Sequence, residues 1–174
     1  MLIRLIPVGD VPPKILNALK EDLSEALPKQ KFIIDSGVPL PKDAYNRFKE
    51  QYRAEYILDV LRDRGVLLAV TTADIFADKL HFVYGLAEYR GPAIVSTARL
   101  DPQFYKESPN FQLLMSRLVK EAIHEIGHIF GLSHCQYPEC VMSYSNNVKF
   151  VDKKKKWFCD SCKVKMSTEG IDLC

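Results

Sequence analysis

The chain has 174 residues, of which 47% are hydrophobic and 26% are charged, and its formal net charge is +2. This length suffices for one domain with a buried core, and the composition is ordinary for a globular protein. So small a net charge gives no indication of nucleic-acid or membrane binding. No apolar stretch approaches a membrane span, and the apolar N-terminal stretch is too short for a secretion signal, so we expect a cytoplasmic protein.

Strand-like and helix-like patterns alternate through the first hundred residues. Short apolar stretches predict strands, whereas apolar residues three and four apart predict helices. The expected order is a strand at 2–8, a helix at 12–27, a strand at 32–38, a long helix from 43 or 44 to 64 with Phe48 in the core, and strands at 66–72, 83–89 and 93–98. This order predicts a mixed, mostly parallel sheet with right-handed crossovers.

A further helix is predicted to begin at Ser108 as N-cap, with Pro109 as its first residue, and to end at Gly131. Most of its apolar residues form one broad face, and His124 and His128 lie roughly opposite the centre of that face. The helix can therefore bury its back against the sheet and present both imidazoles to a cleft.

The most informative segment is the eleven-residue run HEIGHIFGLSH from His124 to His134. Residues four apart share a helix face, so His124 and His128 can bind one metal ion. A left-handed turn at Gly131 brings His134 toward the same metal. Three neutral imidazoles leave one position of a tetrahedral zinc open to a water, whose pKa falls to about 7. Glu125 projects beside the pair, where it can take a proton from that water and pass it to a leaving amine.

The five cysteines are Cys135, Cys140, Cys159, Cys162 and Cys174. The first four form two closely spaced pairs, which suit a structural zinc whose four thiolates leave no position for substrate. Disulfides or free core thiols are the alternative, but a chain without a secretion signal is expected in a reducing compartment. Cys174 has no partner in this pattern, and we expect a free thiol at a frayed end.

The motif HExxHxxGxxH is the metzincin signature, and the cysteines placed around Met142 resemble those of the archaemetzincins, a metzincin family with a second, four-cysteine zinc site. The resemblance covers about residues 108–162. It implies a zincin-like three-layer α-β-α sandwich with about five strands, a methionine turn in which Met142 packs under the histidines, and a C-terminal segment held by zinc. We therefore expect two zinc ions in one catalytic domain, 1–174, with subdomains of about 1–131 and 132–174.

The resemblance implies two further roles. In metzincins an edge strand beside the cleft pairs with extended substrate, so Gly85, Leu86 and Ala87 are candidates for backbone pairing; an ordinary sheet strand is the alternative. Tyr144 follows Met142 by two positions, as does a tyrosine in astacin-like and serralysin-like metzincins that is thought to stabilise the oxyanion. A packed aromatic residue in a turn is the alternative for Tyr144.

The sequence therefore predicts a zinc-dependent metallopeptidase in which a zinc-bound water, activated by Glu125, attacks a peptide carbonyl. We expect a monomer that acts on a peptide or protein, with no nucleic-acid or membrane partner. The alternatives are a zinc-containing peptide-binding protein with little or very narrow peptidase activity, and a purely structural two-zinc module. The run Lys153–Lys156 is expected to form a solvated loop.

Overall fold

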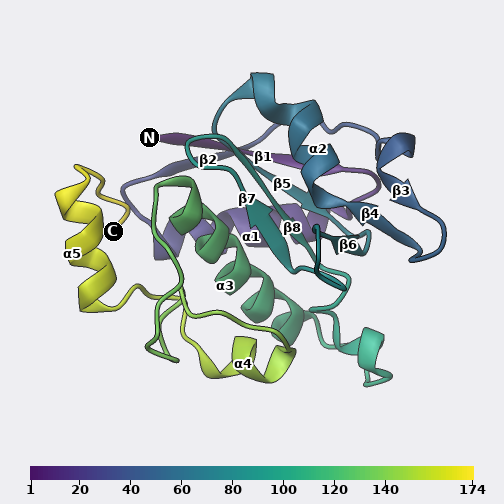
Figure 1. The fold of residues 1–174 in the computed structure, drawn as a ribbon. Helices are drawn as coiled ribbons and strands as arrows, with labels where there is room; N and C mark the ends of the chain where they lie inside the picture. The colour runs from purple at the N-terminus through teal and green to yellow at the C-terminus, as the bar shows by residue number, and fades with distance from the viewer.

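A five-stranded sheet forms the centre of the computed structural model, which describes residues 1–174 (Figure 1). The strand order is β2-β1-β5-β8-β7, where the bounds are Lys31–Ile34, Leu2–Val8, Leu67–Thr71, Pro92–Ser96 and Gly85–Ala87. Neighbouring strands are parallel, except that β7 at the edge is antiparallel to β8. The prediction of a mixed, mostly parallel sheet is confirmed.

Helices cover both faces of this sheet (Figure 1). Helices α1 (Pro13–Ala26) and α3 (Phe111–Ile129) pack on one face, and α2 (Ala54–Leu61) packs on the other. Because side chains alternate along a strand, Leu68 of β5 joins the core shared with α1 and α3, whereas Leu67 faces α2. The three-layer α-β-α arrangement is confirmed.

The long helix predicted from 43 or 44 to 64 is wrong in its first half. A 3-10 turn is followed by a hairpin of β3 (Tyr45–Asn46) and β4 (Gln51–Arg53), and only then by α2 and a second 3-10 turn at 62–64. The side-chain oxygen of Asn46 accepts hydrogen bonds from the N–H groups of Phe48 and Lys49, and Glu50 has a φ of +55°. Such side-chain-to-backbone bonds favour a turn over a helix.

The hairpin removes Phe48 from the core, since its side chain is 87% exposed. Strand β4 also pairs with β6 (Ile75–Phe76), which completes a small three-stranded sheet that the sequence did not predict. This sheet lies away from α3, beside α2 (Figure 1).

Helix α3 begins two residues later than predicted. Its N-cap is Asn110, whose side-chain oxygen accepts a hydrogen bond from the Leu113 N–H at 3.0 Å, and Pro109 precedes this cap. At the other end Gly131 has a φ of +96°, and the Leu132 N–H donates to the Gly127 carbonyl. This is the glycine-terminated helix end that the sequence predicts.

The segment after Gly131 crosses back beside α3 and carries α4 (Val148–Lys153) and α5 (Asp160–Thr168). It shares one core of 33 residues with the sheet, to which Leu173 contributes. The Gln30 side chain donates to the Asp172 carbonyl, so the C-terminus packs against the domain. The expectation of a frayed end is therefore wrong. None of the five cysteines, Cys174 included, forms a disulfide bond. None of the helices combines the length and hydrophobicity needed to cross a membrane.

Candidate active site

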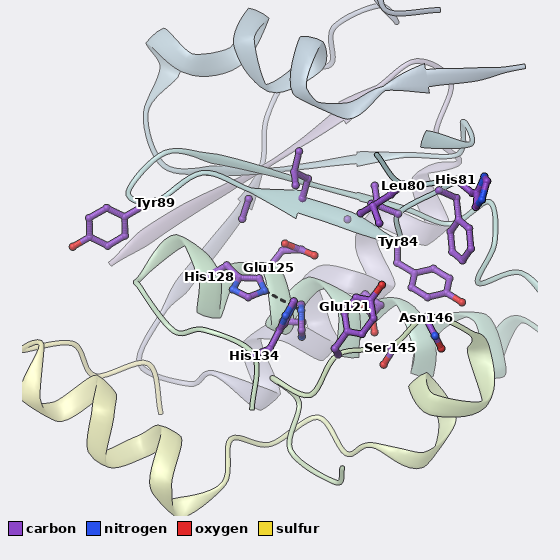
Figure 2. Close-up of a pocket in the computed structure, with 17 residues that line it drawn as sticks. Leu80, His81, Tyr84, Tyr89, Glu121, Glu125, His128, His134, Ser145 and Asn146 are labelled. Atoms are coloured by element: carbon purple, nitrogen blue, oxygen red, sulfur yellow. Dashed lines mark hydrogen bonds between the residues drawn. The ribbon is translucent and has the colours of Figure 1, made fainter. Parts of the chain in front are cut away.

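A cleft of about 610 Å³ lies between the edge strand β7 and helix α3 (Figure 2). The backbone of β7 forms one wall, and α3 contributes His124, Glu125 and His128. The segment after α3 contributes His134 and the residues 144–146. The predicted histidines and glutamate therefore meet in a single cavity large enough for a substrate side chain and its backbone.

The three motif histidines converge. Their potential ligand atoms lie within 4.8 Å of one another, and the Nε2 atoms of His124 and His128 are 3.0 Å apart. The Nδ1 of His124 lies 2.8 Å from the Val141 carbonyl oxygen, and that of His128 lies 2.7 Å from the Leu132 carbonyl oxygen. Because a carbonyl only accepts, each Nδ1 carries the proton and each Nε2 directs a lone pair into the cluster. This donor set and orientation suit Zn²⁺.

Burial keeps these imidazoles neutral. It lowers the pKa of His124 well below 6.5, and the nearby ammonium of Lys154 lowers it further. Burial also lowers the pKa values of His128 and His134. A neutral imidazole is the form that binds a metal ion, so these shifts favour metal binding at neutral pH.

Glu125 lies between the histidines and β7. A Cβ on Gly85 would lie 2.7 Å from the Glu125 Cγ and 2.6 Å from the Ile94 carbonyl oxygen, so only glycine fits there. Burial raises the pKa of Glu125 well above 4.5; the carboxylate of Glu121 raises it further, and the ammonium of Lys154 opposes this. The surroundings therefore favour proton uptake by Glu125, as general-base chemistry requires.

Met142 lies beneath the histidines and is fully buried. A Cβ on Gly127 would collide with its sulfur, so the methionine packs directly against α3 between the turns that carry His124 and His128. The adjacent Val141 supplies the carbonyl that orients His124. The methionine turn thus contacts α3 by packing and His124 by a hydrogen bond.

Tyr144 lines the cleft, and its ring centroid lies 5.2 Å from that of His134. Tyr144 is 56% exposed. Gly85, Leu86 and Ala87 also line the cleft, all half-buried.

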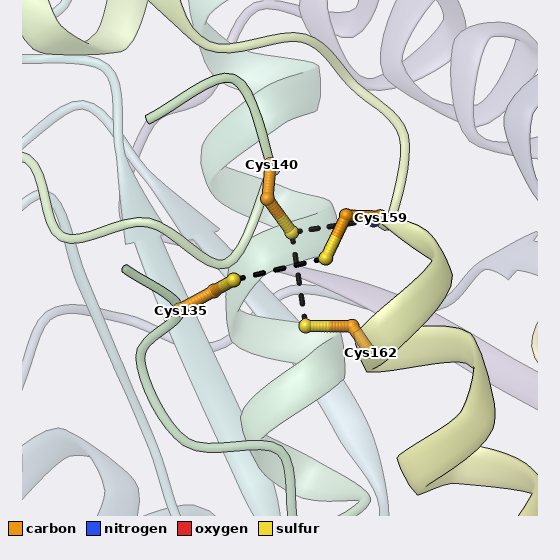
Figure 3. A group of neighbouring side chains, drawn as sticks. All are labelled: Cys135, Cys140, Cys159 and Cys162. Carbon is orange, nitrogen blue, oxygen red and sulfur yellow. Dashed lines mark hydrogen bonds between the residues drawn. The ribbon is translucent and has the colours of Figure 1, made fainter. Parts of the chain in front are cut away.

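The four predicted cysteine ligands gather in a second cluster (Figure 3). The Sγ atoms of Cys135 and Cys159 are 3.7 Å apart, and those of Cys140 and Cys162 are 3.8 Å apart. A tetrahedral zinc with Zn–S bonds of about 2.3 Å separates its sulfurs by about 3.8 Å, whereas a disulfide bond measures about 2.05 Å. The N–H groups of Met142 and Cys159 both donate to the Cys140 sulfur, which favours a thiolate.

The model of peptidase family M54 matches residues 14–168. The chain belongs to this family. It is 42% identical to the archaemetzincin of Methanocaldococcus jannaschii over 173 residues, which cover 98% of this chain and 96% of that one. It is 37% identical to the archaemetzincin of Pyrococcus furiosus, over 92% of this chain and 90% of that one.

Solved structures agree with the sequence comparison. A crystal structure of archaemetzincin from Archaeoglobus fulgidus, complexed with malonate, matches with a TM-score of 0.85 and 34% identity over 95% of this chain and 99% of that one. An archaemetzincin structure from Methanopyrus kandleri matches with a TM-score of 0.80 and 35% identity over 96% and 94%. The resemblance to the archaemetzincins is confirmed, and the chain is a zinc metallopeptidase.

Sequence reasoning missed a buried ion pair beside this M54 site. The Lys154 Nζ lies 2.8 Å from the Glu121 Oε1 and donates to the Ser143 carbonyl at 3.2 Å, with the lysine side chain 0% exposed. The expectation of a solvated loop over Lys153–Lys156 is therefore wrong at Lys154, because the carboxylate beside it compensates its charge. Glu121 could have been found, since it lies one turn before Glu125 on the same helix face. Nothing in a run of four lysines distinguishes Lys154.

Proposed function

We propose that the chain hydrolyses peptide bonds with one Zn²⁺ bound by His124, His128 and His134, and with Glu125 as general base. The convergence of the three imidazoles beside the Glu125 carboxylate, inside a cleft, carries this proposal. When bound, Zn²⁺ lowers the pKa of a water ligand and polarises the substrate carbonyl. Glu125 accepts a proton from the attacking water at its carboxylate and delivers it to the nitrogen of the leaving amine.

We propose that a second Zn²⁺ is bound by Cys135, Cys140, Cys159 and Cys162. The sulfur separations of 3.7 and 3.8 Å support it. Four thiolates complete the coordination, so the role of this ion is structural. It would tie the segment that follows α3 to the start of α5, and would steady the turn that carries Met142.

We propose that extended substrate pairs with the free edge of β7. The Tyr84 carbonyl and the Glu88 N–H both bond to β8. Because hydrogen bonding alternates along an antiparallel strand, the backbone of Leu86 also faces β8, and Gly85 and Ala87 face the free edge. The candidates for main-chain pairing are therefore Gly85 and Ala87, while Leu86 contributes only to the wall of the cleft.

We propose that the Tyr144 hydroxyl donates a hydrogen bond to the oxyanion that develops on the substrate carbonyl. Its place in the cleft beside His134 and its exposure support this role. Met142 and Gly131 serve structural roles, as the floor and the turn of the site. The monomeric state, the cytoplasmic location and the two subdomains stay predictions from the sequence.

Glu125→Gln tests the mechanism. The carboxamide keeps the size of the side chain but cannot take a proton, so we expect unchanged zinc content and a kcat reduced about 10²–10⁴-fold. The matched control is Glu21→Gln, an exposed glutamate on α1. A Glu125→Gln protein that cleaves peptides as fast as the wild type would exclude this role. Peptide binding without cleavage by the zinc-loaded wild type would favour the peptide-binding alternative.

A further inference from the structure

Two buried hydroxyl groups at one end of the cleft make no hydrogen bond within the protein. They belong to Tyr84, which is 4% exposed, and Ser145, which is 9% exposed. Both line the cleft with Glu121 and Asn146, and Figure 2 shows these four residues gathered on one side of the histidines. Buried side-chain hydroxyls are nearly always hydrogen-bonded in proteins, so two unpartnered ones in residues that line a cleft point to a polar ligand.

The Tyr84 hydroxyl has no hydrogen-bond partner of acceptable geometry, although the phenol of Tyr105 lies beside it. Tyr105, the phenol beside it, donates its own proton to the Arg99 carbonyl oxygen at 2.7 Å. Burial raises the pKa of Tyr84 far above its usual value, and the neighbouring Tyr105 and Glu121 raise it further. Tyr84 therefore stays protonated throughout the physiological range of pH.

The direction of the cleft assigns this end to the residue that follows the scissile bond. Strand β7 runs from Gly85, beside Glu125, toward Tyr89 near the end of α3, where the Arg90 N–H donates to the Ile129 carbonyl. We infer that the peptide pairs antiparallel to β7, as β8 does on the other side, so that it runs the opposite way, past the histidines and toward Tyr84. Tyr89 and Tyr84 lie on opposite sides of the histidines in Figure 2. The side chain after the cleaved bond therefore points to the end that holds Tyr84.

The charges around this end of the cleft are already paired. Glu121 lies 2.8 Å from Lys154, and Arg117 makes two hydrogen bonds to Asp152. The ammonium of Lys120 donates to the backbone carbonyls of residues 151 and 152. Apart from Glu125, which is assigned to the reaction, this end of the cleft thus offers no unpaired carboxylate for a basic side chain and no free cation for an acidic one.

We propose that Tyr84 and Ser145 form a specificity pocket for a neutral hydrogen-bonding side chain, the carboxamide of glutamine or asparagine, directly after the scissile bond. This inference rests on the proposed peptidase function. A primary amide both donates and accepts, so it can bond to the two hydroxyls and to the cleft-lining carboxylate of Glu121 together. An aliphatic side chain would leave these groups buried and unpaired, and the site would reject it.

The test uses four peptides that differ only at the residue after the cleaved bond, which is Gln, Leu, Arg or Glu. For the zinc-loaded wild type we expect kcat/KM for the Gln peptide to exceed that for the Leu peptide at least about tenfold. Tyr84→Phe and Ser145→Ala should each reduce this ratio about threefold. Tyr45→Phe on the remote strand β3 is the matched control and should leave the ratio unchanged. Thermal unfolding shows that each variant is folded.

Two results would overturn the pocket and leave the peptidase intact. One is cleavage of the Leu, Arg or Glu peptide in preference to the Gln peptide, and the other is a ratio that neither Tyr84→Phe nor Ser145→Ala changes. If the wild type cleaves no peptide, hydrolysis fails but the pocket is still tested. Labelled versions of the peptides are then titrated into the zinc-loaded protein, and fluorescence anisotropy should show about tenfold tighter binding of the Gln peptide than of the Leu peptide. Equal or weaker binding overturns the pocket.

Discussion

Lys154→Met tests the buried ion pair that joins α3 to the methionine turn. The lysine side chain is 0% exposed, its Nζ lies 2.8 Å from the Glu121 carboxylate, and it donates to the Ser143 carbonyl. Methionine retains much of the packing of the lysine stem but leaves the carboxylate buried without a partner. Removing one member of such a pair costs about 3–5 kcal/mol. We expect a loss of this size in the free energy of unfolding at pH 8, a large share of the roughly 5–15 kcal/mol of a typical domain.

The loss should depend on pH in a defined direction. Burial raises the pKa of Glu121 above its usual value, and Lys154 opposes that rise. In Lys154→Met the folded-state pKa of Glu121 therefore rises further above its unfolded value. A carboxyl raised in this way favours folding at low pH, and this contribution is lost as the pH rises through the folded-state pKa. The difference in the free energy of unfolding between the wild type and Lys154→Met should therefore shrink as the pH falls from 8 toward 6.

A second substitution separates the orphaned charge from lost packing. Adding Glu121→Gln to Lys154→Met replaces the buried carboxylate by a neutral amide, and should recover at least half of the loss. The assay is urea unfolding in zinc-saturated buffer at pH 6, 7 and 8, followed by the fluorescence of Trp157, the only tryptophan. Lys153→Met, on the exposed neighbour, is the control and should change stability by less than about 0.5 kcal/mol. The reasoning is refuted if Lys154→Met costs less than about 1 kcal/mol at pH 8, or if the double variant is no more stable than the single one.

Two further predictions concern the metal and the methionine turn. Metal analysis of the purified chain should find two zinc ions. Mild chelation should remove one of them together with the peptidase activity, while the closed cysteine site retains the other. A single zinc, or two ions lost together, would contradict the proposed sites. Gly127→Ala places a methyl group against the Met142 sulfur. The resulting overpacking should lower the free energy of unfolding by about 1–3 kcal/mol. This loss should equal or exceed the gain of about 1 kcal/mol that alanine brings in helix propensity. Thermal unfolding of the zinc-loaded variant measures the balance, and a clear gain in stability would show that Met142 does not pack at Gly127.

The catalytic constellation could be predicted because it is built from local geometry. His124 and His128 share a face for the same reason that any residues four apart do, and Gly131 turns the chain within three residues of His134. The cysteine cluster was predictable for a related reason, since two closely spaced cysteine pairs are a common pattern of structural zinc sites. These inferences needed no knowledge of which distant segments pack together.

The sequence predictions that proved wrong concern residues whose structure is decided by distant or competing interactions. Phe48 sits in a sequence with helical periodicity, but the Asn46 side chain bonds to the following backbone, and β4 gains β6 as a partner 23 residues away. Periodicity alone cannot weigh these bonds against a helix. Lys154 was missed for the same kind of reason, because its partner Glu121 lies on another element.

The polar end of the cleft was also beyond sequence reasoning. It combines Tyr84 from the approach to β7, Glu121 from α3 and Ser145 from the segment after Met142, which meet only in the folded chain. The proposed catalytic chemistry is therefore encoded within one short segment, whereas the contacts proposed to select a substrate are distributed along the chain. This division explains why the sequence predicts how a bond is broken but not which bond.

The methionine turn connects the histidine cluster and the cysteine cluster through three consecutive residues. Cys140 belongs to the cysteine cluster, the Val141 carbonyl orients His124, and Met142 packs against Gly127. A displacement of this turn would therefore change the orientation of a catalytic ligand and the packing under it together. A zinc bound by four thiolates would hold the cysteine end of this turn, which a small domain cannot easily achieve by burying more apolar surface. We therefore expect loss of the proposed cysteine-bound zinc to disturb the geometry of the histidine cluster as well.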